Sequence, residues 1–228
     1  MVKADLIDNY GNHIVATDED QVSFENISSD NASLSNFGVD ANGYITVDYK
    51  MGETVNDPVV ETTAESYTDT LFFEKEPAPP NAMSFVIQSD ATGGDTITVG
   101  SGTDIALSDT VTDEFGNDAN GYDIAFLSSN GSFSADTVTV AGGLAEPTWT
   151  EDSTAGSYTI TAKPVGIDLE ETVDVVVMPD APDSIALEPN DSDTVYTAGQ
   201  TAALTVKAYD QYGNWTNAND TVQYGNFP

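Results

Sequence analysis

Short alternations of apolar and polar residues recur along the whole chain, and turn-forming residues bound each of them. An alternation with a period of two predicts a β-strand that buries one face. Helical periodicity is absent from the sequence, so we expect an all-β protein. The segment between residues 81 and 180 predicts strands near residues 83–89, 103–112, 122–127, 137–140, 144–149, 157–162 and 170–178. Seven short strands in about 100 residues are typical of an immunoglobulin-like β-sandwich.

A five-residue pattern, Asp-x-x-Gly-Asn, occurs three times and has an aromatic residue at its third position in every copy. An alternating strand precedes each copy, and a second apolar alternation follows it. Glycine adopts the positive φ that tight turns need, and Asp and Asn side chains bond to turn amides. The pattern therefore predicts the same turn in three repeats, formed by Asp8, Gly11 and Asn12, by Asp113, Gly116 and Asn117, and by Asp210, Gly213 and Asn214.

Two proline-rich segments, residues 77–80 and 179–182, divide the chain at an interval of about one repeat. Proline restricts φ and lacks a backbone donor, so both segments are predicted to be stiff linkers ahead of a first strand. We therefore expect tandem modules: residues 1–78 without their first strand, a complete module at residues 81–180, and the N-terminal part of a third at residues 183–228. Incomplete modules expose unpaired strand edges, which we expect flanking sequence or a neighbouring chain to cover.

The charge balance is extreme, because 39 Asp and Glu residues face five Lys, for a formal net charge of −34. Neutralising phosphates needs clustered cations, so nucleic-acid binding is excluded. The absence of Cys excludes a disulfide scaffold and any Cys-based zinc site. Carboxylates spread over a surface repel one another in dilute buffer, whereas molar salt shortens the Debye length to about 3 Å. We therefore expect a protein of a salt-loving organism, and an acidic surface protein of an ordinary organism is the alternative.

Several features together resemble a known family: the three turns with their flanking strands, the strand at residues 155–162, and the segment at residues 42–47. The chain is similar to the bacterial immunoglobulin-like domains of the invasin and intimin type. This resemblance implies a sandwich module that serves in extracellular stalks and adhesins and has no catalytic role. The receptor-binding tips of that family usually lie in other domains, so the resemblance implies no receptor site here. The acidity departs from typical members and favours a haloarchaeal or similar surface protein.

Calcium is the one ion that the sequence favours, and no cofactor is required. Calcium takes six to eight oxygen ligands from carboxylates, amides and carbonyls, and the acidic clusters could supply them. The candidate ligands are Asp109, Asp113, Asp118, Asp191 and Asp193. None of them follows the spacing of an EF-hand loop, so solvated acidic loops are the alternative.

Asn-x-Ser/Thr sequons are mildly enriched and predict N-glycosylation of an exported protein. The acceptors are Asn26, Asn31, Asn130, Asn190, Asn214 and Asn219.

The predicted function is structural or adhesive, outside the cell and at its surface, with the repeated modules as building blocks of a stalk, a filament or a surface layer in high salt. Catalysis is not expected, because His13 is the only histidine and has no counterpart in the other repeats. No apolar run reaches the roughly 18 residues that a membrane-spanning helix needs, so no membrane insertion is expected within this segment. The predicted partners are neighbouring immunoglobulin-like modules, copies of the same chain, and cell-surface or matrix components. The alternatives are a carbohydrate-binding module that uses Trp215, the stalk of an exported enzyme, and a segment of a viral spike or tail fibre.

Overall fold

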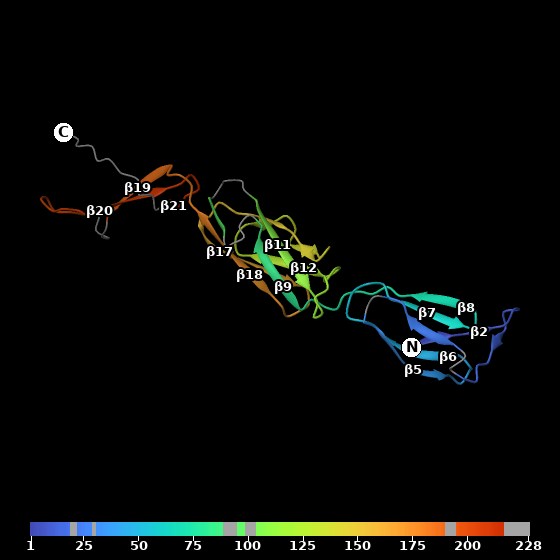
Figure 1. The fold of residues 1–228 in the computed structure, drawn as a ribbon. Helices are drawn as coiled ribbons and strands as arrows, with labels where there is room; N and C mark the ends of the chain where they lie inside the picture. The colour runs from blue at the N-terminus through green and yellow to red at the C-terminus, as the bar shows by residue number, and fades with distance from the viewer. Residues whose placement is uncertain (19–21, 29–30, 89–94, 99–103, 190–194, 217–228) are drawn as a thin grey trace. The chain divides into compact units, whose positions relative to one another are not determined.

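The computed structural model describes residues 1–18, 22–28, 31–88, 95–98, 104–189 and 195–216 (Figure 1). These residues form β-strands and no helix, which confirms the predicted all-β class. None of them therefore forms a helix that could span a membrane. Contacts divide the chain into two compact units. The first unit combines Met1–Asn81 with Thr112–Asn120, and the second combines Ala82–Val111 with Gly121–Pro228.

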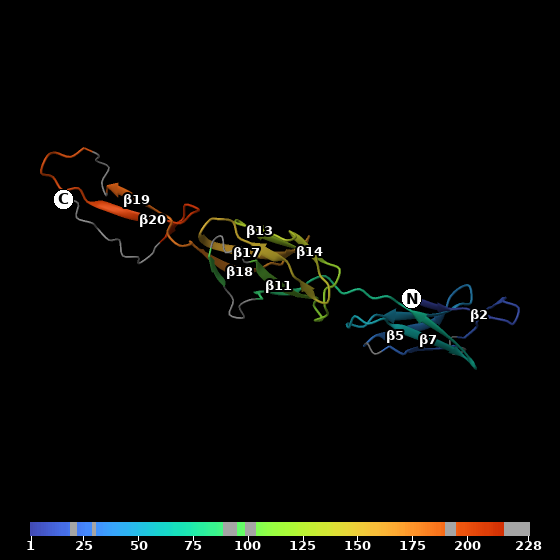
Figure 2. The same cartoon turned by 90° about the horizontal axis from the view of Figure 1, so that it is seen from above.

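The first unit contains two three-stranded antiparallel sheets and a short hairpin, in which β2 pairs with β3 (Figures 1 and 2). One sheet has the order β1-β6-β5 and the other has the order β4-β7-β8. The strands are β1 (Val2–Ala4), β2 (Leu6–Ile7), β3 (His13–Ile14), β4 (Ser23–Asn26), β5 (Ser33–Val39), β6 (Ile45–Lys50), β7 (Val59–Ala64) and β8 (Tyr67–Phe72). Side chains from both sheets form one buried core, made of Val2, Ala16, Val22, Phe24, Ile45, Val47 and Val60.

The second unit contains a complete sandwich of two five-stranded sheets. One sheet has the order β10-β18-β17-β12-β14, and the other has the order β13-β16-β11-β15 with β9 also paired to β11. Its strands are β9 (Ala82–Ile87), β10 (Asp95–Thr98), β11 (Ile105–Thr112), β12 (Asp123–Ser128), β13 (Ser132–Phe133), β14 (Thr137–Thr139), β15 (Leu144–Ala145), β16 (Thr148–Thr150), β17 (Gly156–Pro164) and β18 (Glu171–Met178). The alternation of β18 places Val173, Val175 and Val177 in the core.

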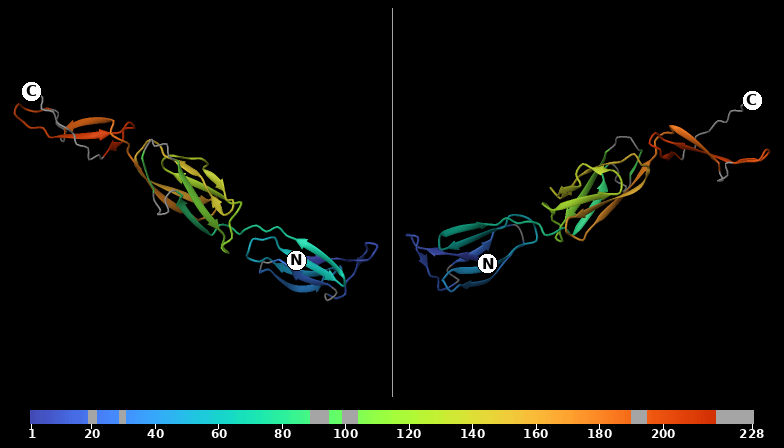
Figure 3. Two further views of the ribbon diagram at one scale, coloured as in Figure 1. Left: turned by 45° about the horizontal axis from the view of Figure 1, so that its top comes forward. Right: turned by 180° about the vertical axis from the view of Figure 1, so that it is seen from behind.

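A third, smaller sheet completes the second unit. It has the order β19-β20-β21, with β19 (Ser184–Pro189), β20 (Leu204–Tyr209) and β21 (Trp215–Thr216). Its two longer strands lie side by side in both views of Figure 3, where they are coloured orange to red. Ile185 and Leu187 on β19 are exposed, so this sheet has no second layer over that face within the described residues.

The strands predicted between residues 81 and 180 are confirmed, with one difference in the segment 144–149. That segment forms two strands, β15 and β16, instead of one. Pro147 separates them because it has no N–H for the ladder, and its carbonyl accepts a hydrogen bond from the Leu107 N–H at 3.0 Å. The structure also adds β10 and β13, which the sequence pattern did not predict.

Each sheet draws its strands from only one of the predicted modules, 1–78, 81–180 or 183–228. The division by contacts is coarser, because it gives two units and assigns the turn Thr112–Asn120 to the first of them. The three module boundaries therefore stay predictions.

Candidate functional site: the repeated Asp-x-x-Gly-Asn turns

The three repeated turns share one internal hydrogen-bond pattern. In the first copy, the Asp8 Oδ1 accepts the N–H groups of Tyr10 and Asn12 at 2.8 and 2.9 Å, and the Asn12 Nδ2 donates to Asp8 Oδ2 at 2.9 Å. The copies that begin at Asp113 and Asp210 repeat these bonds at 2.8–2.9 Å. The Gly residue of each turn has φ between 82° and 86°, a conformation that glycine adopts without strain. The sequence-predicted turn is therefore present in all three places.

These bonds hold the Asp carboxylates in their charged form. The Asn12 side-chain donor, followed by backbone N–H donors, lowers the pKa of Asp8 below its ordinary value. Partial burial opposes this effect at Asp113 and Asp210, but the bonds from the Asn side chain and the backbone still lower the pKa of both.

Inside the first unit, the second copy of the turn bonds to a loop and a linker. The Asn117 Nδ2 donates to the Glu53 carbonyl at 2.7 Å, and the Asn117 Oδ1 accepts the Val55 N–H at 3.1 Å. The Asp113 Oδ2 accepts the Ala78 N–H at 3.1 Å. The turn is thus tied to a loop that follows β6 and to the proline-rich linker.

Inside the second unit, the third copy makes the same three bonds. The Asn214 Nδ2 donates to the Ser153 carbonyl and the Asn214 Oδ1 accepts the Ala155 N–H, both at 2.9 Å. The Asp210 Oδ2 accepts the Asp180 N–H at 3.0 Å. A side-chain amide carries a donor and an acceptor, so Asn can bond to a backbone N–H and a carbonyl two residues apart in the way that another peptide group would.

The first copy lacks these outer bonds within the part of the chain that the structure describes. There the Asn12 side chain bonds only to Asp8. The aromatic residue of this copy is also the most exposed, since Tyr10 is 90% exposed against 48% for Phe115 and 41% for Tyr212. The Asn side chains of the second and third copies therefore bond to segments outside their own turns, whereas that of the first copy has no such bond among the described residues.

Sequence reasoning missed a fourth turn of this shape, at residues 40–44. The Asp40 Oδ1 accepts the N–H groups of Asn42 and Tyr44 at 2.9 and 3.1 Å, and Gly43 has a φ of 85°. Tyr44 stands where the repeated pattern has Asn, so a search for Asp-x-x-Gly alone would have found this turn. The Lys3 Nζ donates to Asp40 Oδ2 at 2.6 Å and, as the largest cause, lowers the pKa of Asp40 to about 2.

His13 has a structural position beside that fourth turn. Its Nδ1 contacts Asp5 Oδ1, its Nε2 contacts the Asn42 carbonyl at 2.9 Å, and its ring lies 4.6 Å from that of Tyr44. Both ring nitrogens face oxygen acceptors, and the bond to Asp5 in particular raises the pKa of His13. Both nitrogens are engaged in contacts that hold the ring in place, so this arrangement does not favour an active-site role.

The candidate calcium ligands do not converge within the described residues, where no cluster of three or more Asp, Glu, His or Cys could hold a metal. Asp109 points into the core of the complete sandwich, and Asp113 is occupied by its own turn. Asp191 and Asp193 lie outside the described residues, so calcium binding there stays a prediction.

The predicted glycosylation sites differ in how accessible their amides are. The Asn130 side chain is buried, and its Nδ2 donates to Asp152 Oδ1 at 2.6 Å. The Asn214 amide is engaged in the turn bonds described above. Asn26 is partly buried and accepts a bond from the Tyr49 hydroxyl, whereas Asn31 is exposed. Asn190 and Asn219 lie outside the described residues, so glycosylation stays a prediction.

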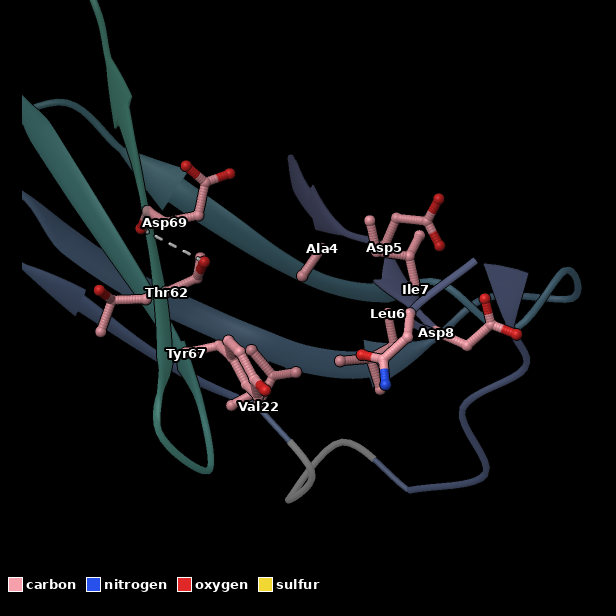
Figure 4. Close-up of a pocket in the computed structure, with 12 residues that line it drawn as sticks. Ala4, Asp5, Leu6, Ile7, Asp8, Val22, Thr62, Tyr67 and Asp69 are labelled. Atoms are coloured by element: carbon pink, nitrogen blue, oxygen red, sulfur yellow. Dashed lines mark hydrogen bonds between the residues drawn. The ribbon is translucent and has the colours of Figure 1, made fainter. Parts of the chain in front are cut away.

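A cavity of about 430 Å³ opens in the first unit between the β1–β2 segment and β7–β8 (Figure 4). Tyr67 and Asp69 border it on one side, and Ala4, Leu6 and Asp8 border it on the other (Figure 4). A second cavity of about 330 Å³ shares four of its lining residues and continues along β8.

Comparison with known proteins supports the fold. No protein-family profile and no characterised sequence matches the chain. Solved structures do: FdeC, an Escherichia coli adhesin, at 15% identity and a TM-score of 0.61; InvD of Yersinia pseudotuberculosis, at 18% and 0.58; and invasin, a bacterial integrin-binding protein, at 18% and 0.50. The chain has the immunoglobulin-like fold of invasin-type adhesins. The resemblance noted in the sequence is thereby confirmed for the fold.

The invasin-type structures are longer than this chain. Each match covers 92–93% of the chain, but only 68% of the FdeC structure, 65% of the InvD structure and 43% of the invasin structure. The identities are too low to transfer an activity or a partner, so what these adhesins bind remains a statement about them.

Proposed function

We propose that the chain is a non-catalytic segment of an extracellular stalk or adhesin, in which the Asp-x-x-Gly-Asn turns hold consecutive immunoglobulin-like modules in a fixed succession. The observation that carries this proposal is the repeated set of bonds at Asn117 and Asn214. Each of these side chains bonds to a loop that lies 59–64 residues earlier in the sequence, before a proline-rich linker. The invasin-type fold and the surface adhesins that share it support an extracellular role.

The mechanism is mechanical. Proline-rich linkers restrict the backbone, and the neighbouring Asp carboxylate accepts the linker N–H of Ala78 or Asp180. Two bonds from Asn and one from Asp then restrain the junction at three points. In arrays of this kind each module contacts only its neighbours, so length can change without changing the fold.

The test is to remove both Asn side chains and measure how the modules tumble. We expect the variant Asn117→Ala, Asn214→Ala to keep its strands, while ¹⁵N relaxation reports shorter and independent rotational correlation times for the modules. Asn12→Ala is the matched control, because the Asn12 side chain bonds only to Asp8 among the residues that the structure describes. If the double variant and the unchanged protein tumble alike, the turns do not hold the modules and the proposal fails.

We also propose a high-salt setting, on the basis of charge. Ion pairs join Lys3 with Asp40, Lys207 with Glu188, and His13 with Asp5, but five Lys in the whole sequence can compensate few of its 39 carboxylates. Salt should screen the remaining repulsion, so the melting temperature should rise steeply from dilute buffer to 2–3 M KCl. A neutral solute at equal osmolality is the control. A melting temperature that stays level across the KCl series would contradict this setting.

A further inference from the structure

The bonds of Asn117 and Asn214 end on two loops that correspond to each other, which we call the receiving loops. They are residues 52–55, after β6, and residues 152–155, after β16. Each loop gives a carbonyl and, two residues later, an N–H to the Asn of a turn, and the residue between them is Thr in both. One side-chain amide can bond to both groups only if the loop backbone holds them at the right spacing.

In the first unit, a second asparagine bonds to the receiving loop. The Asn31 Oδ1 accepts the Glu53 N–H at 2.8 Å, and the Asn31 Nδ2 donates to Glu53 Oε2 at 3.3 Å. Asn31 lies two residues before β5, whose first residue, Ser33, pairs with Lys50 at the end of β6 (Figure 1). The pairing of β5 with β6 therefore brings Asn31 next to the loop that follows β6.

The second unit repeats this arrangement with Asn130. The Asn130 Oδ1 accepts the Asp152 N–H at 3.2 Å, and the Asn130 Nδ2 donates to Asp152 Oδ1 at 2.6 Å. Asn130 lies two residues before β13, whose first residue, Ser132, pairs with Thr150 at the end of β16. The two asparagines thus have the same place in their units, and each bonds to the N–H and to the carboxylate of one acidic residue.

The carbonyl of the central Thr is also bonded in both loops, but the donors differ. The Thr54 carbonyl accepts the Lys75 Nζ at 2.6 Å, whereas the Thr154 carbonyl accepts the Tyr158 hydroxyl at 3.0 Å. Lys75 follows β8 and Tyr158 lies in β17, so the two donors come from different parts of their units. The bonded backbone group is therefore common to the two loops, while the side chain that bonds to it is not.

We propose that Asn31 and Asn130 are positioning residues, each of which holds its receiving loop in the conformation that the Asn of a turn binds. This inference rests on the proposed function and deepens it, because it assigns the receiving half of each junction. A loop that is already held loses less conformational entropy when Asn117 or Asn214 binds it.

The experiment measures amide hydrogen exchange of the whole chain at high salt, and the diagnostic group in the first unit is the Val55 N–H. That N–H bonds to Asn117, so its exchange reports whether the loop is still held for the turn. Asn117→Ala removes this bond and should speed the exchange about tenfold, which is the effect of one hydrogen bond. Asn31→Ala leaves the Asn117 side chain in place and should still speed the exchange roughly threefold or more.

An exchange of the two bonded side chains separates positioning from general damage to the fold. Asn31→Asp alone places a second carboxylate beside Glu53, so it should speed the exchange of the Val55 N–H. Asn31→Asp combined with Glu53→Gln restores a bond between an amide and a carboxylate in the reverse direction, and should return the exchange to that of the unchanged chain. Both variants lack the Asn-x-Ser sequon, so a glycan cannot cause the rescue.

In the second unit, Asn130→Ala should speed the exchange of the Ala155 N–H, which bonds to Asn214. Gln88→Ala is the matched control, because it removes an exposed bond between an amide and a carboxylate, from Gln88 Nε2 to Glu146 Oε1 at 2.6 Å, that does not involve the loop. This control should leave the Ala155 N–H unchanged.

The outcomes separate this inference from the proposed function. If Asn117→Ala frees the Val55 N–H and Asn31→Ala does not, the positioning role is wrong and the proposed function stands. If Asn31→Ala frees it and the exchanged pair fails to restore protection, the loss was general damage and the positioning role is wrong as well. If Asn117→Ala itself leaves the Val55 N–H unchanged, the turn does not hold the loop, and both proposals fail.

Discussion

The strands β18 and β8 occupy corresponding places in the second and the first unit but differ completely in burial. Val173, Val175 and Val177 of β18 lie in a closed core, while all of β8 is exposed. Both strands pair with one antiparallel neighbour, and only β18 has a second neighbour, β10, among the described residues. This contrast indicates that β9 and β10, more than the pairing of β18 with β17, bury the inward face of β18, while the first unit buries only the residues nearer to the middle of its two sheets.

The difference in burial also predicts which substitutions change the free energy of unfolding of each unit. A fully buried side chain has many dispersion contacts and no contact with water, whereas an exposed one gains little from folding. Truncating a core side chain should therefore lower the free energy of unfolding of the second unit strongly. Truncating an exposed side chain of β8 in the first unit should lower it only weakly.

The largest expected effect is at Trp149. Its side chain is fully buried, and its Nε1 donates to the Asn130 carbonyl at 3.0 Å. Trp149→Ala should lower the free energy of unfolding of the second unit by about 3–5 kcal/mol, because it leaves a cavity and an unpaired carbonyl. Phe72→Ala is the matched change on β8, where Phe72 is 70% exposed, and should stay within about 0.5 kcal/mol.

Hydrogen exchange in increasing urea reports the two units separately, which a single melting curve of a two-unit chain does not. Comparable losses from the two substitutions would show that the two environments are alike and would remove the basis of the comparison.

The next largest effect is expected at Asp109, a carboxylate inside the closed core. Both of its carboxylate oxygens are buried away from water. Burial raises the pKa of Asp109 to about 7: a bond from the Ser84 backbone lowers the pKa by less, and the nearby Glu171 adds to the rise. The folded state therefore binds a proton that the unfolded state releases near pH 4, so this group costs stability as the pH rises from about 4 to 7.

Asp109→Val should remove that cost. At pH 8 the variant should be more stable than the unchanged chain by roughly 2–4 kcal/mol, and the difference should vanish below about pH 4. Ala4→Asp is the matched change, because Ala4 has the same position relative to its turn but borders the cavity between the β1–β2 segment and β7–β8, where water can hydrate a carboxylate. Denaturation measured between pH 4 and pH 8 checks both, and a variant with an unchanged pH profile would show that Asp109 stays hydrated.

Local features of this molecule could be predicted from the sequence, and contacts between distant segments could not. The turn at Asp113 was predictable because Asp, Gly and Asn act within five residues, through capping bonds and a positive φ. The Asn117 side chain bonds to backbone atoms of Glu53 and Val55. Every residue has these atoms, so the residue types at positions 53 and 55 could not predict the bonds. The alternation of β11 predicted its buried face.

Asp109 stands among the apolar residues of that alternation, and its burial was not predicted from the sequence. A carboxylate beside Asp113 was predicted as a calcium ligand, yet it points into the core with Ile105, Leu107 and Val111 on the same face of β11. Alternation alone places Asp109 on the same face of the strand as its apolar neighbours. Its charge suggests a solvent-exposed position instead, and the sequence does not show which of the two decides.

The smallest expected effect concerns an exposed ion pair at β1, a strand that borders the second cavity of the first unit. The Lys3 Nζ donates to Asp40 Oδ2 at 2.6 Å and lowers the pKa of Asp40 to about 2. Lys3→Met should raise that pKa, but not fully to 3.8, because the N–H groups of Asn42 and Tyr44 still bond to the carboxylate. Carboxyl ¹³C titration measures the change.

Lys207→Met is the control in the second unit, since it removes a comparable exposed pair with Glu188 and should leave the pKa of Asp40 unchanged. The stability that Asp40 contributes is present above pH 3.8 and is lost as the pH falls through about 2, so neither variant should alter unfolding at neutral pH by a large amount. An Asp40 that titrates at its ordinary value in the unchanged chain would mean that Lys3 does not hold β1 to the fourth turn. The first unit would then be open on that side as well as along β8, and the contrast with the closed sandwich would be sharper still.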